Sequence, residues 1–113
     1  MTITTTSLGK TTIIRLEGNL MGGPDANALN AKVHELADLM QVRVVLDLGR
    51  VQFMNSSGLG LLIGAASTLK NAGGALKIAG ASEKILALIK VTKLSGVLET
   101  FPTVDGAAAS FGK

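Results

Sequence analysis

The stretch from residue 42 to residue 60, VRVVLDLGRVQFMNSSGLG, decides the fold of this chain. Its first part, Val42 to Leu48, is nearly all apolar, which is typical of a strand covered on both faces of a parallel or mixed sheet. Gly49 to Asn55 is expected to lead out of this strand as a loop. Ser56 and Ser57 then precede residues whose apolar positions follow a helical period, so the loop delivers two serines to the start of a helix.

Segments with strand-like and helix-like patterns alternate on both sides of this stretch. Before the central stretch we expect a hairpin of Ile3–Leu8 and Thr12–Leu16 around the turn Gly9-Lys10, a loop over Gly18–Pro24, and a helix that Asp25 caps and that runs to about Met40. The helix from Ser56 should end at Gly73-Gly74 and be followed by a strand at Ala75–Ala79. The last expected elements are a helix begun by Ser82 and Glu83, a short strand at Val97–Phe101 and a weak helix over Thr103–Phe111. The order β-β-α-β-α-β-α-β-α predicts an α/β fold with a mixed central sheet of about five strands, opened by the hairpin, and about four helices. With 113 residues we expect one domain over residues 1–113.

The composition indicates a globular protein and excludes several kinds of chemistry. Hydrophobic residues make up 47% of the chain and charged residues 17%. There is no cysteine, which excludes disulfides, thiol catalysis and cysteine metal sites and fits a cytoplasmic location. No apolar run approaches the roughly 18 residues that a membrane span needs, and the first residues do not resemble a signal peptide, so we expect no membrane insertion.

The net charge of +3 is spread along the chain instead of forming a basic stripe. Aromatic residues make up 3% of the chain and do not alternate with the basic ones. Nucleic-acid binding favours a basic stripe or stacking aromatics, so we expect no direct nucleic-acid contact. We expect the lysines to lie on solvated faces: Lys10, Lys70, Lys77, Lys84, Lys90, Lys93 and Lys113.

Ser56 and Ser57 stand where a phosphate group would be stabilised. Backbone N–H groups at a helix start lack partners within the helix, and the helix dipole is positive there. A phosphoserine at this point would add about −1.5 to −2 charges without melting the helix, which suits a reversible interaction switch. The simpler interpretation is that one serine only caps the helix.

The residues from Phe53 to Gly60 resemble the phosphorylation loop of anti-sigma factor antagonists of the STAS family, whose pattern is an acid, Ser, Ser or Thr, Gly, Leu, Gly. Gly18-Asn19-Leu20 resembles the family's Gly-Glu-Leu after its second strand. Residues 71–74 and 92–97 also match the family's layout. The resemblance thus covers nearly the whole chain and implies a STAS-like domain.

The resemblance implies a regulatory binding module instead of an enzyme. It makes Ser56 the phosphorylated residue, with Ser57 as the alternative. The implied partner is an anti-sigma factor that is also a serine kinase and that itself binds ATP and Mg²⁺. The unphosphorylated antagonist would sequester this kinase and free a sigma factor for transcription, and a phosphatase would reset the phosphorylated form. No cofactor or metal is expected in this chain.

The sequence departs from the family pattern by losing acidic residues near the serines. Asn55 replaces the acid before Ser56, and Asn19 and Met21 replace acids of the family's Gly-Glu-Leu-Asp turn. These changes remove like-charge repulsion against a phosphate, and Asn55 can still act as an Asx turn or a helix cap. The expected partner-binding loop comprises Asn19, Met21, Met54, Asn55, Ser56, Ser57, Gly58 and Leu59. Leu20, Met21, Met54 and Leu59 could also form an apolar patch around the serines, with core packing as the alternative for the methionines.

Other candidate sites have weaker support in the sequence. The glycines Gly58, Gly60 and Gly64 have a GxGxxxG spacing instead of the dinucleotide GxGxxG, and close packing explains them better. His34 is the only histidine and is expected to face solvent without a metal. Asp47 is expected to have a structural role, either facing a strand end or pairing with Arg43 or Arg50, and nothing in the sequence joins it to Ser56 and His34 as a triad.

Three functions remain open from the sequence. The first is the phosphorylation-switched antagonist. The second, motivated by the neutral Asn55, is a STAS subunit of a lipid-transporter or stressosome-like assembly that acts through protein contacts. The third is a nucleotide-binding or small-ligand enzyme, which is supported only by the glycines.

Overall fold

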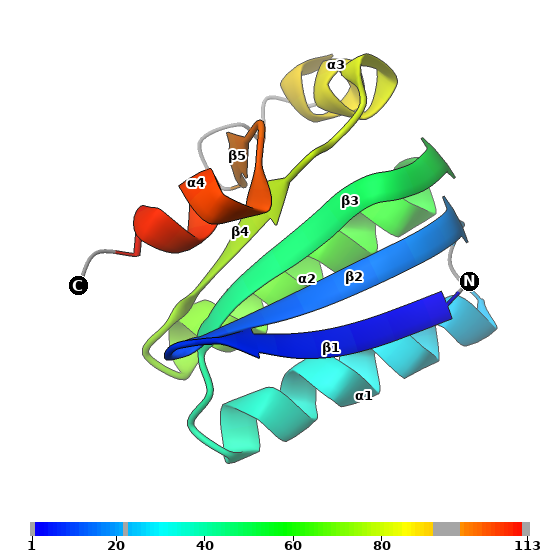
Figure 1. Ribbon diagram of the computed structural model, residues 1–113. Helices are drawn as coiled ribbons and strands as arrows, with labels where there is room; N and C mark the ends of the chain where they lie inside the picture. Colours follow the sequence, from blue (N-terminus) through cyan, green and yellow to red (C-terminus); the bar gives the residue numbers. More distant parts are fainter. Residues whose placement is uncertain (1, 22, 92–97, 112–113) are drawn as a thin grey trace.

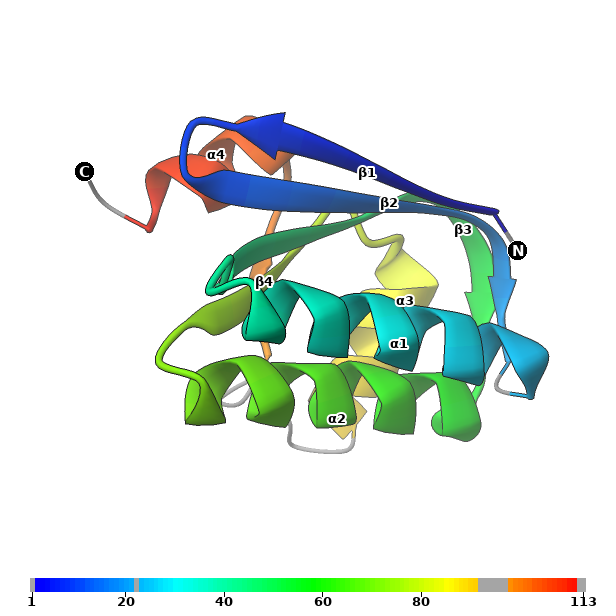
Figure 2. The same ribbon diagram turned by 90° about the horizontal axis from the view of Figure 1, so that it is seen from below.

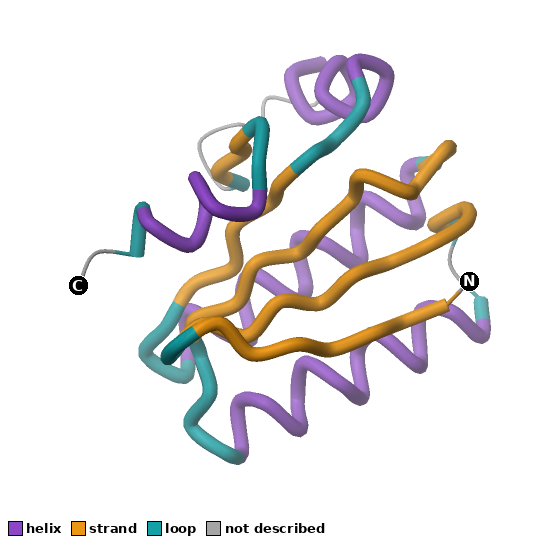
Figure 3. Tube along the Cα trace, viewed as in Figure 1, coloured by secondary structure: helices purple, strands orange, loops and turns teal. Residues whose placement is uncertain are grey.

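The computed structural model describes residues 2–21, 23–91 and 98–111, and these form one sheet with helices on both faces (Figures 1 and 3). The elements in chain order are β1 (Thr2–Leu8), β2 (Thr11–Leu20), α1 (Pro24–Asp38), β3 (Arg43–Met54), α2 (Ser56–Asn71), β4 (Ala75–Ala79), α3 (Glu83–Val91), β5 (Glu99–Phe101) and α4 (Val104–Ala109). The predicted order of strands and helices is confirmed, as is the strand at Ala75–Ala79.

The sheet has five strands in the order β1-β2-β3-β4-β5. β1 and β2 are antiparallel and form the predicted hairpin, while β2, β3, β4 and β5 run parallel. Gly9 has a φ of 62° in the hairpin turn, a conformation that glycine adopts without strain. Because β2 and β3 are parallel neighbours, their carboxyl ends lie at the same edge of the sheet.

The helices divide the molecule into two unequal layers. α1, α2 and α3 cover one face of the sheet, and α4 lies on the other (Figure 2). The main core between sheet and helices is aliphatic and includes Ile14, Leu46, Leu62 and Leu69. A smaller cluster forms between the opposite face and α4, where Ala107 packs against Val45 and its neighbours. The smaller cluster leaves much of that second face open along β1 and β2.

Two strands run further than the sequence predicts. β2 continues through Gly18 to Leu20, so the first part of the loop expected over Gly18–Pro24 is a strand. β3 continues through Gly49 to Met54, so the loop expected over Gly49–Asn55 is wrong. The parallel pairing of β2 with β3 persists because it absorbs two register shifts, one between Arg15 and Glu17 and one after Gly18. Such irregularities interrupt the regular alternation of side chains from which a strand is predicted.

The start of α1 follows backbone geometry, whereas a side chain caps the start of α3. α1 begins at Pro24 and has Gly23, not Asp25, as its N-cap, with a φ of 69°. Proline is favoured in the first turn because its missing N–H would have no helical partner there. α1 ends at Asp38 instead of about Met40. The cap expected from Ser82 is confirmed, because its Oγ accepts a hydrogen bond from Ile85 N at 3.3 Å.

Lys77 is not on a solvated face as predicted, because its side chain lies under α4. The residue is 7% exposed, and its Nζ donates a hydrogen bond to Ser110 Oγ at 2.7 Å. The ammonium also stands 4.6 Å from the ring centroid of Phe111 and 5.5 Å from that of Phe101. Glu99 is 3.9 Å away. Cation–π contacts and a hydroxyl acceptor thus offset the cost of burying this charge.

Asp47 pairs across the sheet and not with the arginines near it in sequence. Its Oδ2 accepts a hydrogen bond from Arg15 Nε at 3.1 Å, and its Oδ1 accepts one from Gly49 N at 2.9 Å. Arg50 instead lies 3.4 Å from Glu17. Arg15 lies opposite Asp47 in the register of β2 and β3, which explains why this partner was preferred. The role of Asp47 is structural, as expected.

Candidate functional site: the serine loop at the start of α2

The turn from β3 into α2 is held by Asn55. Its Oδ1 accepts a hydrogen bond from Gly58 N at 2.9 Å, and its backbone oxygen accepts one from Leu59 N at 2.9 Å. Asn55 has an extended backbone, with φ −101° and ψ −176°, as an N-cap residue requires. The cap is therefore Asn55 itself, and the interpretation that a serine caps the helix is wrong.

Gly58 allows α2 to begin directly against β2. A Cβ atom at this position would collide with the backbone oxygen of Leu20 and would stand 2.9 Å from Met54 Cγ. The close-packing role expected for the glycines is confirmed at Gly58. The same prediction is wrong for Gly60 and Gly64, because a Cβ atom at either position would meet no atom within 4 Å.

Ser56 and Ser57 are both exposed in the first turn of α2. Their backbone N–H groups have no hydrogen-bond partner within the described ranges, as expected for the first residues of a helix. The first turn contains no acidic residue. The helix start is thus a positive, accessible position where a phosphate on either hydroxyl would meet unpaired N–H groups.

The end of β2 lies beside the serine loop, as the partner-loop prediction requires. The register pairs Asn19 with Phe53 and Leu20 with Met54. Asn19 is exposed, and Met21, just beyond the strand, is 43% exposed. The two positions that lack the family's acids are therefore next to the turn that carries Ser56.

The exposed apolar side chains near the serines differ from those that the sequence predicts. Met54 is 6% exposed and packs in the main core with Leu20 and Leu59, so these three side chains stabilise the loop from beneath. Phe53, which the prediction omitted, is 50% exposed. The register shift in β3 explains this result, because it leaves Phe53 on the open face while Met54 enters the core.

The remaining candidates do not add a second centre. His34 is exposed, as expected. Across residues 2–21, 23–91 and 98–111, no three His, Cys, Asp or Glu side chains are grouped so that they could hold a metal ion. Among those same residues, no helix is both long and apolar enough to cross a membrane. The carboxylate of Asp47 is engaged with Arg15 and Gly49, not with His34.

The fold and the serine loop together define a class of protein. The family model of the STAS domain matches residues 2–107. This chain belongs to the STAS domain family, as the sequence resemblance implied. The match includes the sheet, the serine loop and the first four residues of α4.

Three known proteins illustrate what the chain is similar to. An anti-sigma-B factor antagonist of Listeria monocytogenes is 36% identical over 72 residues, which are 60% of this chain and 63% of that protein. BtrV of Bordetella bronchiseptica, assigned as an anti-sigma factor antagonist, is 30% identical over 112 residues, 90% of this chain and 94% of its own. The phosphorylated form of SpoIIAA, a Bacillus cell fate determinant, has the same fold, with a TM-score of 0.75, 21% identity and coverage of 97% and 99%.

Proposed function

We propose that this protein is an anti-sigma factor antagonist that is switched by phosphorylation of Ser56. The observation that carries the proposal is the start of α2, where two exposed serines follow an Asn55 cap and no acid stands in the first turn. The relatives from Listeria monocytogenes and Bordetella bronchiseptica support it, because both are described as antagonists of anti-sigma factors. SpoIIAA supports it because that protein, which shares the fold, exists in a phosphorylated form.

Phosphorylation at this position would change the surface and leave the fold intact. A phosphoserine adds about −1.5 to −2 charges and three acceptor oxygens. The unpaired N–H groups of Ser56 and Ser57 and the positive helix end accommodate that charge. The hydroxyl of Ser56 makes no contact that the fold needs, so the modification acts on a partner and not on folding.

The proposed partner is an anti-sigma factor with serine kinase activity. In this mechanism the kinase supplies ATP and Mg²⁺, the unphosphorylated antagonist sequesters the kinase, and the sigma factor is released for transcription. Phosphorylation ends the complex because a doubly negative group must then be buried at the interface without a matched cation. A phosphatase restores the binding form. The antagonist itself performs no catalytic step.

The surface beside Ser56 supports a protein partner. Phe53 on β3 and Met21 just beyond the end of β2 are large exposed apolar side chains. Aromatic and methionine side chains are enriched in the centres of protein interfaces. We therefore expect Phe53→Ser and Met21→Ser to weaken partner binding without changing the phosphorylated position.

The proposal is tested with two baits that each lack one of the two serines. Ser56→Ala and Ser57→Ala variants are each used to recover partners from the source cell, and the recovered kinase is then incubated with ATP and the wild-type chain. Fragment mass spectra should place the phosphate on Ser56. Ser57→Ala should remain a substrate and Ser56→Ala should not. Phosphate on Ser57 alone would move the site by one residue, and a recovered kinase that modifies neither serine would refute the switch.

A second function follows from the neutral side chain of Asn55. A STAS subunit of a larger assembly, such as a lipid transporter or a stressosome-like scaffold, would use the same surface without a phosphate. Recovery of a transporter ATPase or of scaffold subunits by the wild-type chain, in place of a kinase, would favour this function. Loss of that recovery in Phe53→Ser would show that the two functions share one surface.

A further inference from the structure

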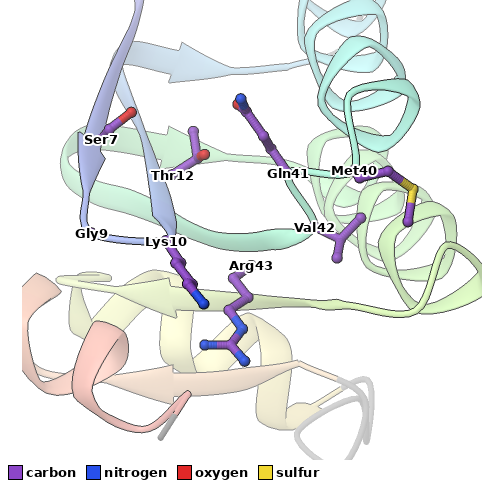
Figure 4. Close-up of a pocket in the computed structure, with 8 residues that line it drawn as sticks. All are labelled: Ser7, Gly9, Lys10, Thr12, Met40, Gln41, Val42 and Arg43. Carbon is purple, nitrogen blue, oxygen red and sulfur yellow. The ribbon is translucent and has the colours of Figure 1, made fainter. Parts of the chain in front are cut away.

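Two cationic side chains meet at the end of the sheet opposite the serine loop. Lys10 belongs to the turn between β1 and β2, and Arg43 is the first residue of β3. Both residues line the same two hollows, and in the view of Figure 4 the Lys10 amine and the Arg43 guanidinium extend toward the same region. Neither group has a carboxylate within 4.0 Å in the part of the chain that the structure describes. Two like charges thus stand next to each other without a counterion from the protein.

The two cations line a hollow of about 350 Å³. Ser7, Thr12 and Gln41 line it as well, and in Figure 4 these three stand apart from the charged ends. Hydroxyl and amide groups of this kind can donate or accept hydrogen bonds. No acidic residue lines this hollow. Its volume is within the range of small-molecule sites, which is about 300–1,000 Å³.

A second hollow, of about 420 Å³, adjoins the same two cations. The beginning and end of α4 contribute Asp105, Ala108 and Ala109 to it. Asp105 is the one acid that lines either hollow, and it forms no ion pair within 4.0 Å with a described residue. Lys10 and Arg43 are therefore shared by two hollows, one without an acid and one that includes residues of α4.

The rim of the first hollow contains a strained residue. Met40 has a φ of 61°, the single positive φ outside glycine among residues 2–21, 23–91 and 98–111, and its side chain is 74% exposed. This conformation costs roughly 1–3 kcal/mol in a residue other than glycine and here belongs to the turn that ends α1. The strain does not define a ligand, and Met40 and Val42 form the apolar part of the hollow's lining.

We propose that this hollow binds a small molecule that bears a phosphate group. The phosphate would lie between Lys10 and Arg43, because a guanidinium and an ammonium together match its charge and its several acceptor oxygens. The polar body of the ligand would lie toward Ser7, Thr12 and Gln41. The site is at the opposite end of β3 from Ser56 and does not rest on the proposed function.

Binding is tested by titrating the full chain with inorganic phosphate, glucose 6-phosphate and glucose while following backbone amide shifts by NMR. We expect saturable shifts at Lys10, Thr12, Gln41 and Arg43 with both phosphate compounds and none with glucose. Tighter binding of glucose 6-phosphate than of inorganic phosphate would show that the polar wall contributes. Equal affinity would show that the cation pair alone binds and that inorganic phosphate suffices as the ligand.

Charge-matched variants decide whether these two cations form the site. Lys10→Gln and Arg43→Gln should each weaken phosphate binding about tenfold or more, as expected when one charge-assisted contact is lost. Lys84→Gln, which removes an exposed charge from α3, should leave it unchanged. Spectra of the unliganded variants verify that each remains folded. Equal affinity in all three variants, or the absence of saturable shifts with either phosphate compound, would overturn the proposal.

Discussion

Helices α1 and α2 lie side by side on the same face of the sheet, yet they begin differently (Figure 2). α2 starts with the Asn55 hydrogen bond to Gly58 N and with Gly58 pressed against the end of β2. α1 starts at Pro24 after the N-cap Gly23, with no side-chain hydrogen bond at the cap. A helix start that is held by a side chain and by close packing can position a modified residue. The start of α1 has no side-chain cap, and Met21 beside it is exposed.

The same two helices end with one motif built from different residues. In α2, Gly73 N donates to Lys70 O at 3.1 Å and Gly74 N donates to Leu69 O at 2.8 Å. In α1, Met40 N donates to Ala37 O at 3.1 Å and Gln41 N donates to Leu36 O at 2.9 Å. Both are Schellman motifs, which place one residue in the left-handed region. Gly73 fits that region with φ 94°, and Met40 occupies it with φ 61°.

The largest effect is expected from filling the contact beneath the serine loop. Gly58→Ala should lower the free energy of unfolding by about 2 kcal/mol, because overpacking costs about 1–3 kcal/mol and the Leu20 backbone cannot give way as a side chain would. Gly60→Ala, with open space around it, should raise the free energy by about 0.5–1 kcal/mol. Urea unfolding measures both. Equal effects of the two changes would mean that Gly58 does not set the approach of α2.

The two helix ends should respond in opposite directions. Gly73→Ala should destabilise the protein by about 1 kcal/mol, because a Cβ disfavours the left-handed conformation. Met40→Gly should stabilise it by about 0.5–1 kcal/mol, after allowance for the greater freedom of glycine in the unfolded chain. Thermal unfolding of the two variants measures the comparison. A destabilised Met40→Gly protein would show that the exposed Met40 side chain makes contacts that outweigh its backbone strain.

The side-chain cap that distinguishes α2 from α1 is tested at Asn55. Asn55→Ala should cost about 1 kcal/mol, because Gly58 N loses its acceptor. Asn55→Asp keeps an acceptor oxygen and adds a negative charge at the positive helix end, so it should be at least as stable as the wild type. Unfolding in guanidinium chloride compares the three proteins. Equal loss in both variants would argue against the capping role.

The smallest effect is expected from charge at Ser56. Ser56→Asp should stabilise the protein by about 0.3–1 kcal/mol at low salt, since the charge is at the N-terminal end of α2. Ser67→Asp, near the other end of the same helix, should destabilise it by a similar amount. Thermal unfolding at about 10 mM and at 1 M salt, where screening suppresses the difference, measures both effects. Two variants that shift in the same direction would show that the helix dipole does not act on this site.

The fold could be predicted from sequence because its apolar pattern and its turn residues agree. Val44, Val45, Leu46 and Leu48 are buried on the two faces of the sheet as expected of a covered strand, and Gly73-Gly74 ends α2. The full length of β2 and β3 could not be predicted, because the register shifts interrupt side-chain alternation. The same irregularity exposes Phe53 and buries Met54, which the pattern alone does not distinguish.

At the candidate site, the local geometry was more predictable than the contacts across the sheet. Asn55 as a cap and Gly58 as a close contact follow from residue type at a helix start. The ion pair of Arg15 with Asp47 joins residues 32 positions apart, so no local spacing indicates it. Phosphorylation of Ser56 stays a prediction, since a helix start shows where a phosphate fits but not which enzyme adds it.

The burial of Lys77 under α4 makes this one lysine a reporter on the opposite face of the sheet. Its amine is enclosed by Ser110 and the rings of Phe101 and Phe111, so amine-directed reagents reach it only when α4 separates from the sheet. Lysines on exposed faces, such as Lys84 and Lys90, react without such an opening. The ratio of their labelling rates therefore measures how often the C-terminal helix undocks.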